Sequence, residues 1–534
     1  MKYAGLVDDA TAQALELRWL EAAVTPPGTY GGRRFATHRP YEPGEEAEAQ
    51  AHAELVMRVA SALDDAKLDA ARDVCRRAPD VLPALARASM GDDLDDANFL
   101  ELQRFFDACE RLDALTAGAP DVPRTTDGAV RACASALERG RSGKFGFYLD
   151  DGFDADLAAQ RVAHAAAQAG YEALRGRQTA AVAAYLEREI SAGEFIVMRD
   201  ELPGGILPAG VRVVREAPTY VLCEIDADEA VIAAIAKRDE AAAAVAIAEA
   251  RVRAALTAIV RDHGAALDTA CDAFAIAECL IAGARFARAH GCTAAALDAS
   301  APFEVLQARF PALQEELRKD GRAFTPIDVM LDGVAVLTGP NMGGKSVALR
   351  TCGFAAVCAA YGLPVPAQRA KMPLFAQISW LGIGGDDAQG GLLSAFAREV
   401  VRLNDILAIA AKPRFVLMDE FARTTTPREG KALVVAVVRR LQSEGAYGLV
   451  ATHVDGVASA AGVRHYAVRG LREMPSRTNG DLRASLAALA DSMDYRLGEV
   501  RGDEVTHGDA IALAELLGAD RRIVADARDE LRRT

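Results

Sequence analysis

The chain has 534 residues, of which 51% are hydrophobic, and it carries a net charge of −15 at pH 7. This length exceeds what one core holds, so we expect two to four domains. No stretch approaches about 18 uninterrupted apolar residues, which excludes a membrane span, and acidic residues stand where a signal peptide needs an apolar run. Nine cysteines occur singly without a Cys-x-x-Cys pair, which is typical of reduced core thiols in a cytoplasmic protein.

The N-terminal region, residues 1–125, has the pattern of a mostly helical segment, and its role is unknown. Its clearest helical pattern is "AEAQAHAELVMRVASALDDAKLDAARDVCRRA", residues 47–78. An interval rich in Gly, Pro and Arg, residues 25–46, interrupts the helical pattern and predicts a loop. We expect this loop to be solvated, in preference to a contact of its arginines with a polyanion.

Residues 126–320 form the second predicted region, an all-α domain with a small β tip. Two long Ala-rich segments, 155–190 and 227–262, have helical patterns, and the second carries apolar residues at helical spacing. Between them, residues 194–226 are rich in β-forming residues around a Pro-Gly-Gly turn, which predicts a hairpin. The simplest arrangement is two antiparallel helices, each roughly 54 Å long, capped by this hairpin and followed by a helix over 265–290.

From about Phe324 the pattern changes to strands alternating with helices, which defines a third region, residues 321–490. The short β runs include "VMLDGVAVLT", "AQISWL", "RFVLMD", "YGLVAT" and "RHYAVR". This order predicts an α/β fold with a mostly parallel sheet and crossover helices. In residues 491–534, "MDYRLGEVRG" predicts a last strand, and two short helices around a turn follow it.

The segment from Gly339 to Ser346, "GPNMGGKS", fits the pattern G-x-x-x-x-G-K-[ST] between a β run and a helix-like segment. Gly343 and Gly344 allow backbone N–H groups to point at phosphate oxygens, at the positive end of the following helix. Lys345 would reach the β- and γ-phosphates of ATP, and the Ser346 hydroxyl would coordinate Mg²⁺. A chance match is the alternative, and the strand–loop–helix setting argues against it.

Two acids follow further along the chain, at the end of the apolar run "FVLM". Asp419 would hold the magnesium ion through water, and Glu420 would orient or deprotonate the attacking water. Such a pair is by itself often just a strand end, but downstream of a phosphate loop it indicates ATP hydrolysis. His453, just past the run "LVAT", is placed to sense the γ-phosphate; a structural role is the alternative for a lone histidine.

These motifs together resemble the MutS family of DNA mismatch repair ATPases. The loop "TGPNMGGKS" is similar to that family's phosphate loop almost letter for letter, including Asn341 and Met342, which generic phosphate binding does not require. "VLMDEFARTTTPREG" and "YRLGEVRGDEVTHGDAIALAELLG" are similar to the family's acidic segment and to its closing strand and helix–turn–helix. The resemblance covers about residues 322–520. It implies an ABC-type P-loop ATPase domain, preceded by an all-α domain of lever helices, in a homodimer with composite ATP sites.

The resemblance also assigns residues outside the central loop. "DDAQGGLLSAFAREV", residues 386–400, is similar to a signature whose serine reaches across the dimer to the partner's ATP, which makes Ser394 its equivalent. "FTPIDVMLDG" resembles the segment in which an aromatic residue packs on the adenine, here Phe324. Val347 continues the nucleotide-binding segment. The implied catalytic set is Lys345, Glu420, His453 and Ser394, with Ser346 and Asp419 for the metal.

The chain also departs from the family pattern. Ala395 replaces the usual threonine of the signature, and Ala422 and Thr424 replace glycines after the acidic pair. No Phe-x-Glu wedge occurs in a suitable place, and we expect the mismatch-reading domain to be missing. The tip, residues 194–226, contains six acidic residues and three arginines. Its net charge of −3 makes it a poor surface for binding a phosphate backbone.

Two cargo hypotheses follow. In the first, lever helices act on structured or branched DNA without reading mismatches directly. In the second, the same engine remodels a protein partner, because truncated MutS-like ATPases resemble components linked with reactivation of cobalamin-dependent aminomutases. The net acidity of the chain favours the second hypothesis. A third possibility, a nucleotide-bound structural switch without hydrolysis, is opposed by the retention of the phosphate-loop lysine, the acidic pair and His453.

Overall fold

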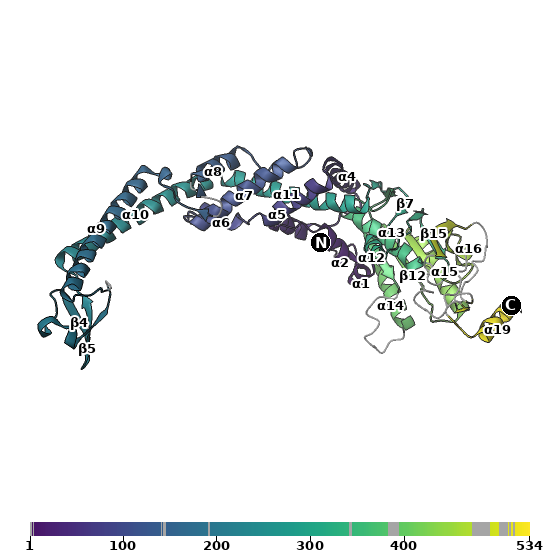
Figure 1. Cartoon of the computed structure of the whole chain (residues 1–534). Coiled ribbons are helices and arrows are strands. Elements are labelled where there is room, and N and C mark those ends of the chain that lie inside the picture. Colours follow the sequence, from purple (N-terminus) through teal and green to yellow (C-terminus); the bar gives the residue numbers. More distant parts are fainter. Residues whose placement is uncertain are drawn as a thin grey trace. The chain divides into compact units, whose positions relative to one another are not determined.

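The computed structural model describes residues 3, 5–139, 141–142, 146–190, 193–340, 344–382, 395–472, 492–500, 511, 514–515 and 518–533. The chain forms two compact units, whose elements are labelled in Figure 1. Unit 1 comprises Met1–Ala78, Arg111–Thr125 and Asp272–Thr534, and unit 2 comprises Pro79–Glu110 and Thr126–Cys271. The chain therefore changes unit after residue 125, where we predicted a border, but residues 79–110 belong to unit 2 and residues 272–320 to unit 1.

Unit 1 begins with five helices: α1 (Asp9–Ala14), α2 (Leu17–Val24), α3 (Thr29–Thr37), α4 (Glu46–Ala62) and α5 (Asp65–Arg77). The prediction of a loop over residues 25–46 was wrong for α3. A distant carboxylate explains this helix: Glu278, fully buried on α11 (Gly264–His290), accepts a hydrogen bond from the Gly31 N–H in the first turn of α3. A Cβ at Gly28 would lie 1.9 Å from Glu278 Oε1, so the glycine leaves room for the carboxylate.

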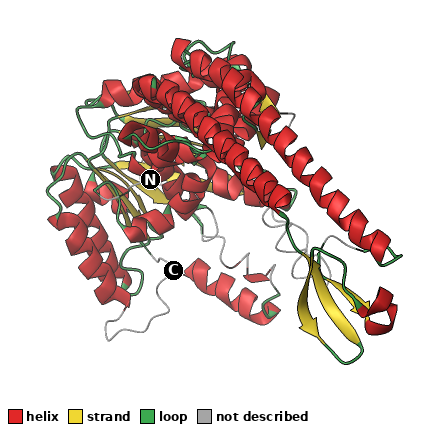
Figure 2. Cartoon of the chain, turned by 90° about the vertical axis from the view of Figure 1, so that its left-hand side faces the viewer, coloured by secondary structure: helices red, strands yellow, loops and turns green. Residues whose placement is uncertain are grey.

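Unit 2 contains the two predicted long helices, α9 (Ala155–Tyr185) and α10 (Glu229–Asp262). They lie side by side and antiparallel (Figures 1 and 2), and Arg161 of α9 pairs with Glu249 of α10 at 2.9 Å. Each begins at an aspartate, Asp154 or Asp228, whose side chain accepts hydrogen bonds from the first turn. The other elements of unit 2 are α6 (Leu82–Met90), the first part of α7 (Asp96–Leu115), α8 (Gly128–Glu138), β1 (Arg141–Ser142), β2 (Gly146–Phe147) and the first turns of α11.

The tip, residues 194–226, is a three-stranded antiparallel sheet (Figure 2). Its strands are β3 (Phe195–Met198), β4 (Val211–Glu216) and β5 (Tyr220–Ile225), in the order β3-β5-β4. A hairpin is present as predicted, but not around the Pro-Gly-Gly turn: Pro203–Gly205 form a short 3-10 helix between β3 and β4, and the hairpin is β4–β5, which turns between Glu216 and Tyr220. β3 pairs with β5 as a third strand. Alternate residues of β3 and β5, including Phe195 and Val221, pack against Val182 and Leu186 at the end of α9.

The central sheet of unit 1 has six strands in the order β11-β12-β13-β9-β14-β15. These are β9 (Val334–Thr338), β11 (Gln377–Leu381), β12 (Arg414–Asp419), β13 (Tyr447–Ala451), β14 (Arg464–Leu471) and β15 (Met493–Glu499). All neighbours are parallel except β14 and β15, which confirms the predicted mostly parallel sheet. The strands β9 and β11 are buried throughout, as expected of strands covered on both faces.

Helices cover both faces of this sheet. On one face lies α13 (Lys345–Ala360), where a Cβ at Gly353 would touch Leu417 of β12 at 2.5 Å. On the other face, Val416 and Met418 of β12 share a core with α14 (Ala395–Ala408), α15 (Pro427–Ser443) and α16 (Val457–Ala461). The crossover helices of the sequence prediction are thus confirmed.

A second sheet in unit 1 has the order β6-β10-β7-β8. The run "VMLDGVAVLT", predicted as one strand, divides between the two sheets, because the chain turns at Asp332–Gly333 between β8 and β9. The remaining elements are β6 (Ala296–Leu297), β7 (Phe303–Ala308), β8 (Ile327–Leu331), β10 (Arg369–Met372), α12 (Pro311–Lys319) and α19 (Arg521–Arg533).

All nine cysteines are free thiols, and eight of them are buried, which confirms their predicted role as small core residues. Among the helices that the structure describes, none combines the length and the apolar character that crossing a membrane requires.

Candidate functional site

The predicted phosphate loop connects the buried strand β9 to α13. Gly344, the residue before the helix, has φ 85°, and a Cβ there would lie 3.1 Å from the Tyr495 ring. Gly339 has φ 145°, and its Cβ would lie 2.9 Å from Val468 Cβ. Both positions therefore require glycine, for backbone conformation and for space. The predicted nucleotide-binding residues Asn341, Met342 and Gly343 lie outside the described residues.

Lys345 is the first residue of α13, and its side chain is almost fully buried. Its ammonium group donates hydrogen bonds to the carbonyl oxygens of Gly339 (2.9 Å) and Pro340 (3.2 Å). Lys345 Nζ also lies 3.6 Å from Glu420 Oε1. The loop and the acidic pair, which are far apart in the sequence, are therefore held together by one cation at the carboxyl edge of the sheet.

The acidic pair stands where β12 ends. The Ser346 hydroxyl donates a hydrogen bond to Asp419, and the half-buried Val347 follows in the same turn of α13. Burial raises the pKa of Asp419 above its ordinary value, a shift that the Ser346 hydrogen bond opposes. Asp419 Oδ1 is buried without a hydrogen-bond partner among the described residues. A carboxylate oxygen and a hydroxyl oxygen are donors that suit Mg²⁺, so the residues present fit the ion.

Glu420 is held by its backbone. It has φ 54°, and its N–H donates to the carbonyl of Ala451 on the adjacent strand β13 at 3.0 Å. Its carboxylate pairs with Arg423 at 3.4 Å and stays about one-fifth exposed. A carboxylate that is fixed at the main chain but open to water can orient or deprotonate a water molecule.

The structure does not join every predicted residue to this cluster. His453 follows β13 at the same edge of the sheet, but its side chain is exposed and makes no hydrogen bond within the described part of the chain. Phe324 is half-buried, three residues before β8 of the second sheet. Ser394 lies outside the described residues. Lys345, Ser346, Asp419 and Glu420 are the predicted residues that the structure brings together.

Ala422 has the left-handed φ of 62°, and its N–H donates to Glu399 Oε2 at 2.9 Å. This is a position where the family resemblance led us to expect glycine. The backbone explains that expectation, since glycine adopts positive φ at little cost and alanine does not.

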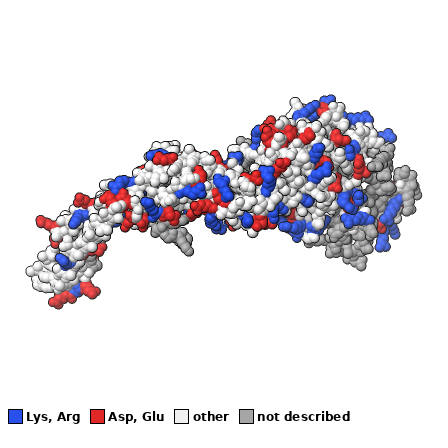
Figure 3. Space-filling model, turned by 90° about the horizontal axis from the view of Figure 1, so that it is seen from above, with Lys and Arg blue, Asp and Glu red and all other residues white. Residues whose placement is uncertain are grey.

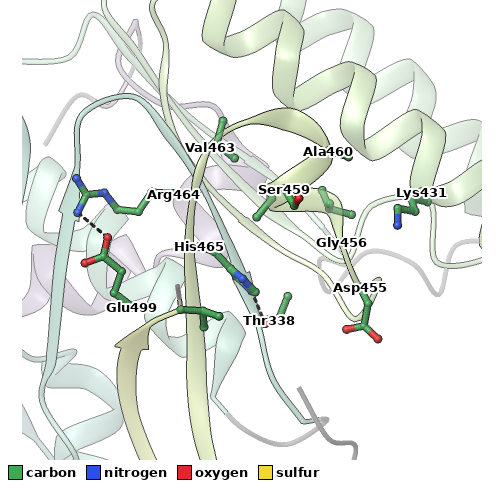
Figure 4. Close-up of a pocket in the computed structure, with 13 residues that line it drawn as sticks. Thr338, Lys431, Asp455, Gly456, Ser459, Ala460, Val463, Arg464, His465 and Glu499 are labelled. Atoms are coloured by element: carbon green, nitrogen blue, oxygen red, sulfur yellow. Dashed lines mark hydrogen bonds and ion pairs between the residues drawn. The ribbon is translucent and has the colours of Figure 1, made fainter. Parts of the chain in front are cut away.

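A cavity of about 690 Å³ adjoins the last residue of β9, on the face of the sheet that α15 and α16 cover (Figure 4). His465 of β14 points to Thr338, and a 2.8 Å hydrogen bond joins Nε2 to the threonine hydroxyl. Burial lowers the pKa of His465. No motif in the sequence pointed to this histidine. The sequence feature that could have identified it is its position in the β run "RHYAVR", because this run forms β14, the strand that pairs with β9.

Comparison with known proteins agrees with the family resemblance. A family model described as MutS domain V matches residues 335–533. The chain is 31% identical over 207 residues to "Endonuclease MutS2" of Pelotomaculum thermopropionicum, a match that covers 38% of the chain and 25% of that protein. It is 29% identical over 297 residues to "DNA mismatch repair protein MutS" of Anaeromyxobacter dehalogenans, covering 53% of the chain and 32% of that protein. The chain therefore spans about a quarter to a third of the length of these relatives.

Proposed function

The chain belongs to the MutS family, and from this premise we propose that it is a Mg²⁺-dependent ATPase that hydrolyses ATP to ADP and phosphate. The observation that carries the proposal is the cluster at the carboxyl edge of the central sheet. There Lys345 lies between the phosphate-loop carbonyls and Glu420, and Ser346 donates to Asp419. An ABC-type P-loop fold accounts for this arrangement.

Each residue of the cluster has a chemical role in the proposal. Lys345 binds the β- and γ-phosphates, and Gly343 and Gly344 present backbone N–H groups to them. Gly339, Asn341 and Met342 complete the nucleotide-binding loop. Ser346 and Asp419 hold the magnesium ion, which supplies positive charge to the phosphates when it is bound. Glu420 takes a proton from the attacking water, and His453 contacts the γ-phosphate side. Phe324 packs on the adenine, and Val347 completes the nucleotide-binding segment.

A binding experiment tests this site. A fluorescent ATP analogue is titrated into the purified chain with and without Mg²⁺. Lys345→Ala removes the ammonium group that donates to the loop carbonyls and pairs with Glu420, and we expect it to abolish measurable binding. Lys371→Ala, on β10 of the second sheet, is the matched control and is expected to bind normally. Equal binding by the Lys345→Ala variant and the wild type would contradict the proposal.

For the assembly, we propose a homodimer in which Ser394 of one protomer completes the ATP site of its partner. The relatives are named for DNA mismatch repair and for endonuclease action, and on this basis the first cargo that we propose is structured or branched DNA. The helices α9 and α10 would be the levers that carry the tip to the DNA.

The tip supports a second candidate, a protein cargo such as a cobalamin-dependent aminomutase. Arg199 pairs with Glu216 at 2.9 Å, and Arg212 pairs with Glu224 at 2.6 Å. Two of the three arginines of the tip are thus already neutralised within it. On the face that Figure 3 shows, uncharged surface at the left-hand end of the view separates small groups of acidic and basic side chains. Five of the large apolar side chains that the structure shows exposed belong to the tip: Ile196, Met198, Ile206, Val213 and Val214. Apolar surface with paired charges suits a protein contact better than a phosphate backbone.

Reversing the charge of one tip residue distinguishes the two cargo hypotheses. Arg212 contacts both Glu224 and Asp226, so Arg212→Glu replaces the pairing cation with a third negative charge beside these two. If the tip binds DNA, affinity for a branched duplex at near-physiological salt falls with this substitution. If the cargo is a protein, the weak DNA affinity of the wild type and of the variant is the same.

A further inference from the structure

Unpaired polar atoms surround the Asp419 carboxylate. Asp419 Oδ1, Trp380 Nε1 and Arg350 Nε are all buried without a hydrogen-bond partner among the described residues. Trp380 of β11 is in register with Leu417 of β12 and is almost fully buried. A Cβ at Gly382 would lie 2.8 Å from Asp419 Cβ and 2.9 Å from Trp380 Nε1, so the indole and the carboxylate are close neighbours.

Arg350 approaches this group from α13. It stands four residues after Ser346 and therefore on the same face of the helix. Its guanidinium carbon lies 6.0 Å from the centroid of the Trp380 ring. Its positive charge acts on Asp419 and opposes, as a small contribution, the rise in pKa that burial causes at that carboxyl, but no hydrogen bond between the two is present. Arg350 instead pairs with Glu16, with Nη1 3.4 Å from Glu16 Oε1.

Glu16 occupies an unusual backbone position between α1 and α2. It has φ 53° and ψ 41°, a left-handed conformation that glycine adopts at lower cost than any other residue. The backbone alone therefore gives no reason for a glutamate here. The interaction of its side chain with Arg350 does.

The chain before Glu16 is fastened to the edge strand β11. The Leu6 carbonyl accepts a hydrogen bond from Ile378 N–H at 2.8 Å. The hydroxyl of the fully buried Thr11 accepts one from Trp380 N–H at 2.9 Å. The N-terminal segment thus packs along β11, beside the end of the sheet that carries Asp419. These hydrogen bonds fix the position of the segment that leads to Glu16.

We propose that Glu16 is a positioning residue that holds the Arg350 guanidinium over Trp380 and away from Asp419, so that Asp419 Oδ1 stays open to Mg²⁺. The inference rests on the proposed Mg²⁺-dependent ATP site. Without the Glu16 carboxylate, Arg350 turns to Asp419, on which its charge already acts, and competes with the metal for that carboxylate. The connection between α1 and α2 thereby has a role in metal binding.

The test is a Mg²⁺ titration of the ADP complex. The chain has two tryptophans, Trp19 and Trp380, so Trp19→Phe leaves Trp380 as the sole reporter beside Asp419. We expect Glu16→Gln to weaken Mg²⁺ affinity about tenfold, the lower end of the effect that changes outside the first ligand shell have on metal affinity, because Arg350 then competes for Asp419. ADP affinity without metal stays unchanged. Glu45→Gln, which removes the 2.6 Å ion pair with Arg39 in the same unit, is the matched control and changes neither affinity.

A suppressor distinguishes positioning from folding. The double variant Glu16→Gln/Arg350→Gln loses the competing cation as well, and we expect its Mg²⁺ affinity to return to within about threefold of the wild type. A double variant weaker than Glu16→Gln alone, or an unchanged affinity in Glu16→Gln, would overturn the inference. Mn²⁺ binding to the ADP complex, followed by electron paramagnetic resonance, repeats the comparison without the Trp19 substitution. Absence of any ADP binding by the wild type would instead refute the proposed function itself.

Discussion

Glu420→Gln is the substitution that separates ATP binding from ATP hydrolysis most cleanly. The backbone of Glu420 is fixed by the hydrogen bond from its N–H to Ala451 and by its left-handed φ of 54°. Glutamine has the same shape and backbone, so the side chain keeps its place. The substitution removes the negative charge and the capacity to accept a proton.

The expected loss follows from the proton-transfer role. A positioned general base contributes about 10²- to 10⁴-fold to a rate, so kcat should fall by that factor, or by about 3–5 kcal/mol in the barrier. ATP affinity should be kept or increase. Lys345 retains its hydrogen bonds to the loop carbonyls, and a negative charge 3.6 Å from its ammonium group no longer opposes the phosphates.

Phosphate release at saturating ATP, together with equilibrium binding of a fluorescent ATP analogue, provides both quantities. Glu429→Gln is the matched control, because Glu429 is exposed in the first turn of α15 and bonds only to Thr426 among the described residues. Normal turnover in Glu420→Gln would refute the assignment of the base. Loss of ATP binding together with turnover would show that Glu420 is structural.

Further predictions concern the dimer, the loop and a buried acid. Mixing Ser394→Ala with Lys345→Ala should restore part of the ATP hydrolysis that each variant lacks, and an inactive mixture of variants that still dimerise would refute the across-dimer role of Ser394. Gly344→Ala should weaken ATP binding about 5- to 30-fold, because a left-handed alanine costs about 1–2 kcal/mol and its Cβ meets Tyr495 at 3.1 Å. Gly445→Ala has similar strain at φ 68° with no atom within 4 Å, so it should leave ATP affinity unchanged; equal losses in both variants would contradict the steric argument. Burial raises the pKa of Glu278 from 4.5 to about 7, so the folded protein binds more protons than the unfolded chain between these values and loses stability as pH rises through them. Between pH 5 and pH 8, the free energy of unfolding of the wild type, measured with denaturant, should fall by about 2–3 kcal/mol more than that of Glu278→Gln. Parallel dependence of the two unfolding free energies on pH would refute this.

The central sheet could be predicted because its signals are local. Each strand is a short apolar run, and the phosphate loop and the acidic pair stand directly after two such runs. Parallel strands place these ends at one edge, which is why Lys345, Asp419 and Glu420 could be assigned to one site and meet in the structure.

The features that sequence analysis missed depend on distant contacts. α3 forms within a Gly- and Pro-rich interval because Glu278, 247 residues after Gly31 in the chain, accepts a hydrogen bond from its first turn. The N-terminal region had no assigned role because its contacts, such as Thr11 with Trp380, join segments 369 residues apart. Periodicity cannot reveal such pairs. The assignments of Asn341, Met342, Gly343 and Ser394 stay predictions.

The first measurement to make is steady-state ATP hydrolysis by the purified chain, because hydrolysis is the activity assigned to the cluster of Lys345, Asp419 and Glu420. It is measured with and without Mg²⁺, alone and with duplex, mismatched and branched DNA at near-physiological salt, because low salt inflates non-specific binding. We predict Mg²⁺-dependent turnover that one structured DNA stimulates more than plain duplex. Turnover that no DNA stimulates would favour the hypothesis that the cargo is a protein. Absence of Mg²⁺-dependent turnover would contradict the proposed ATPase activity.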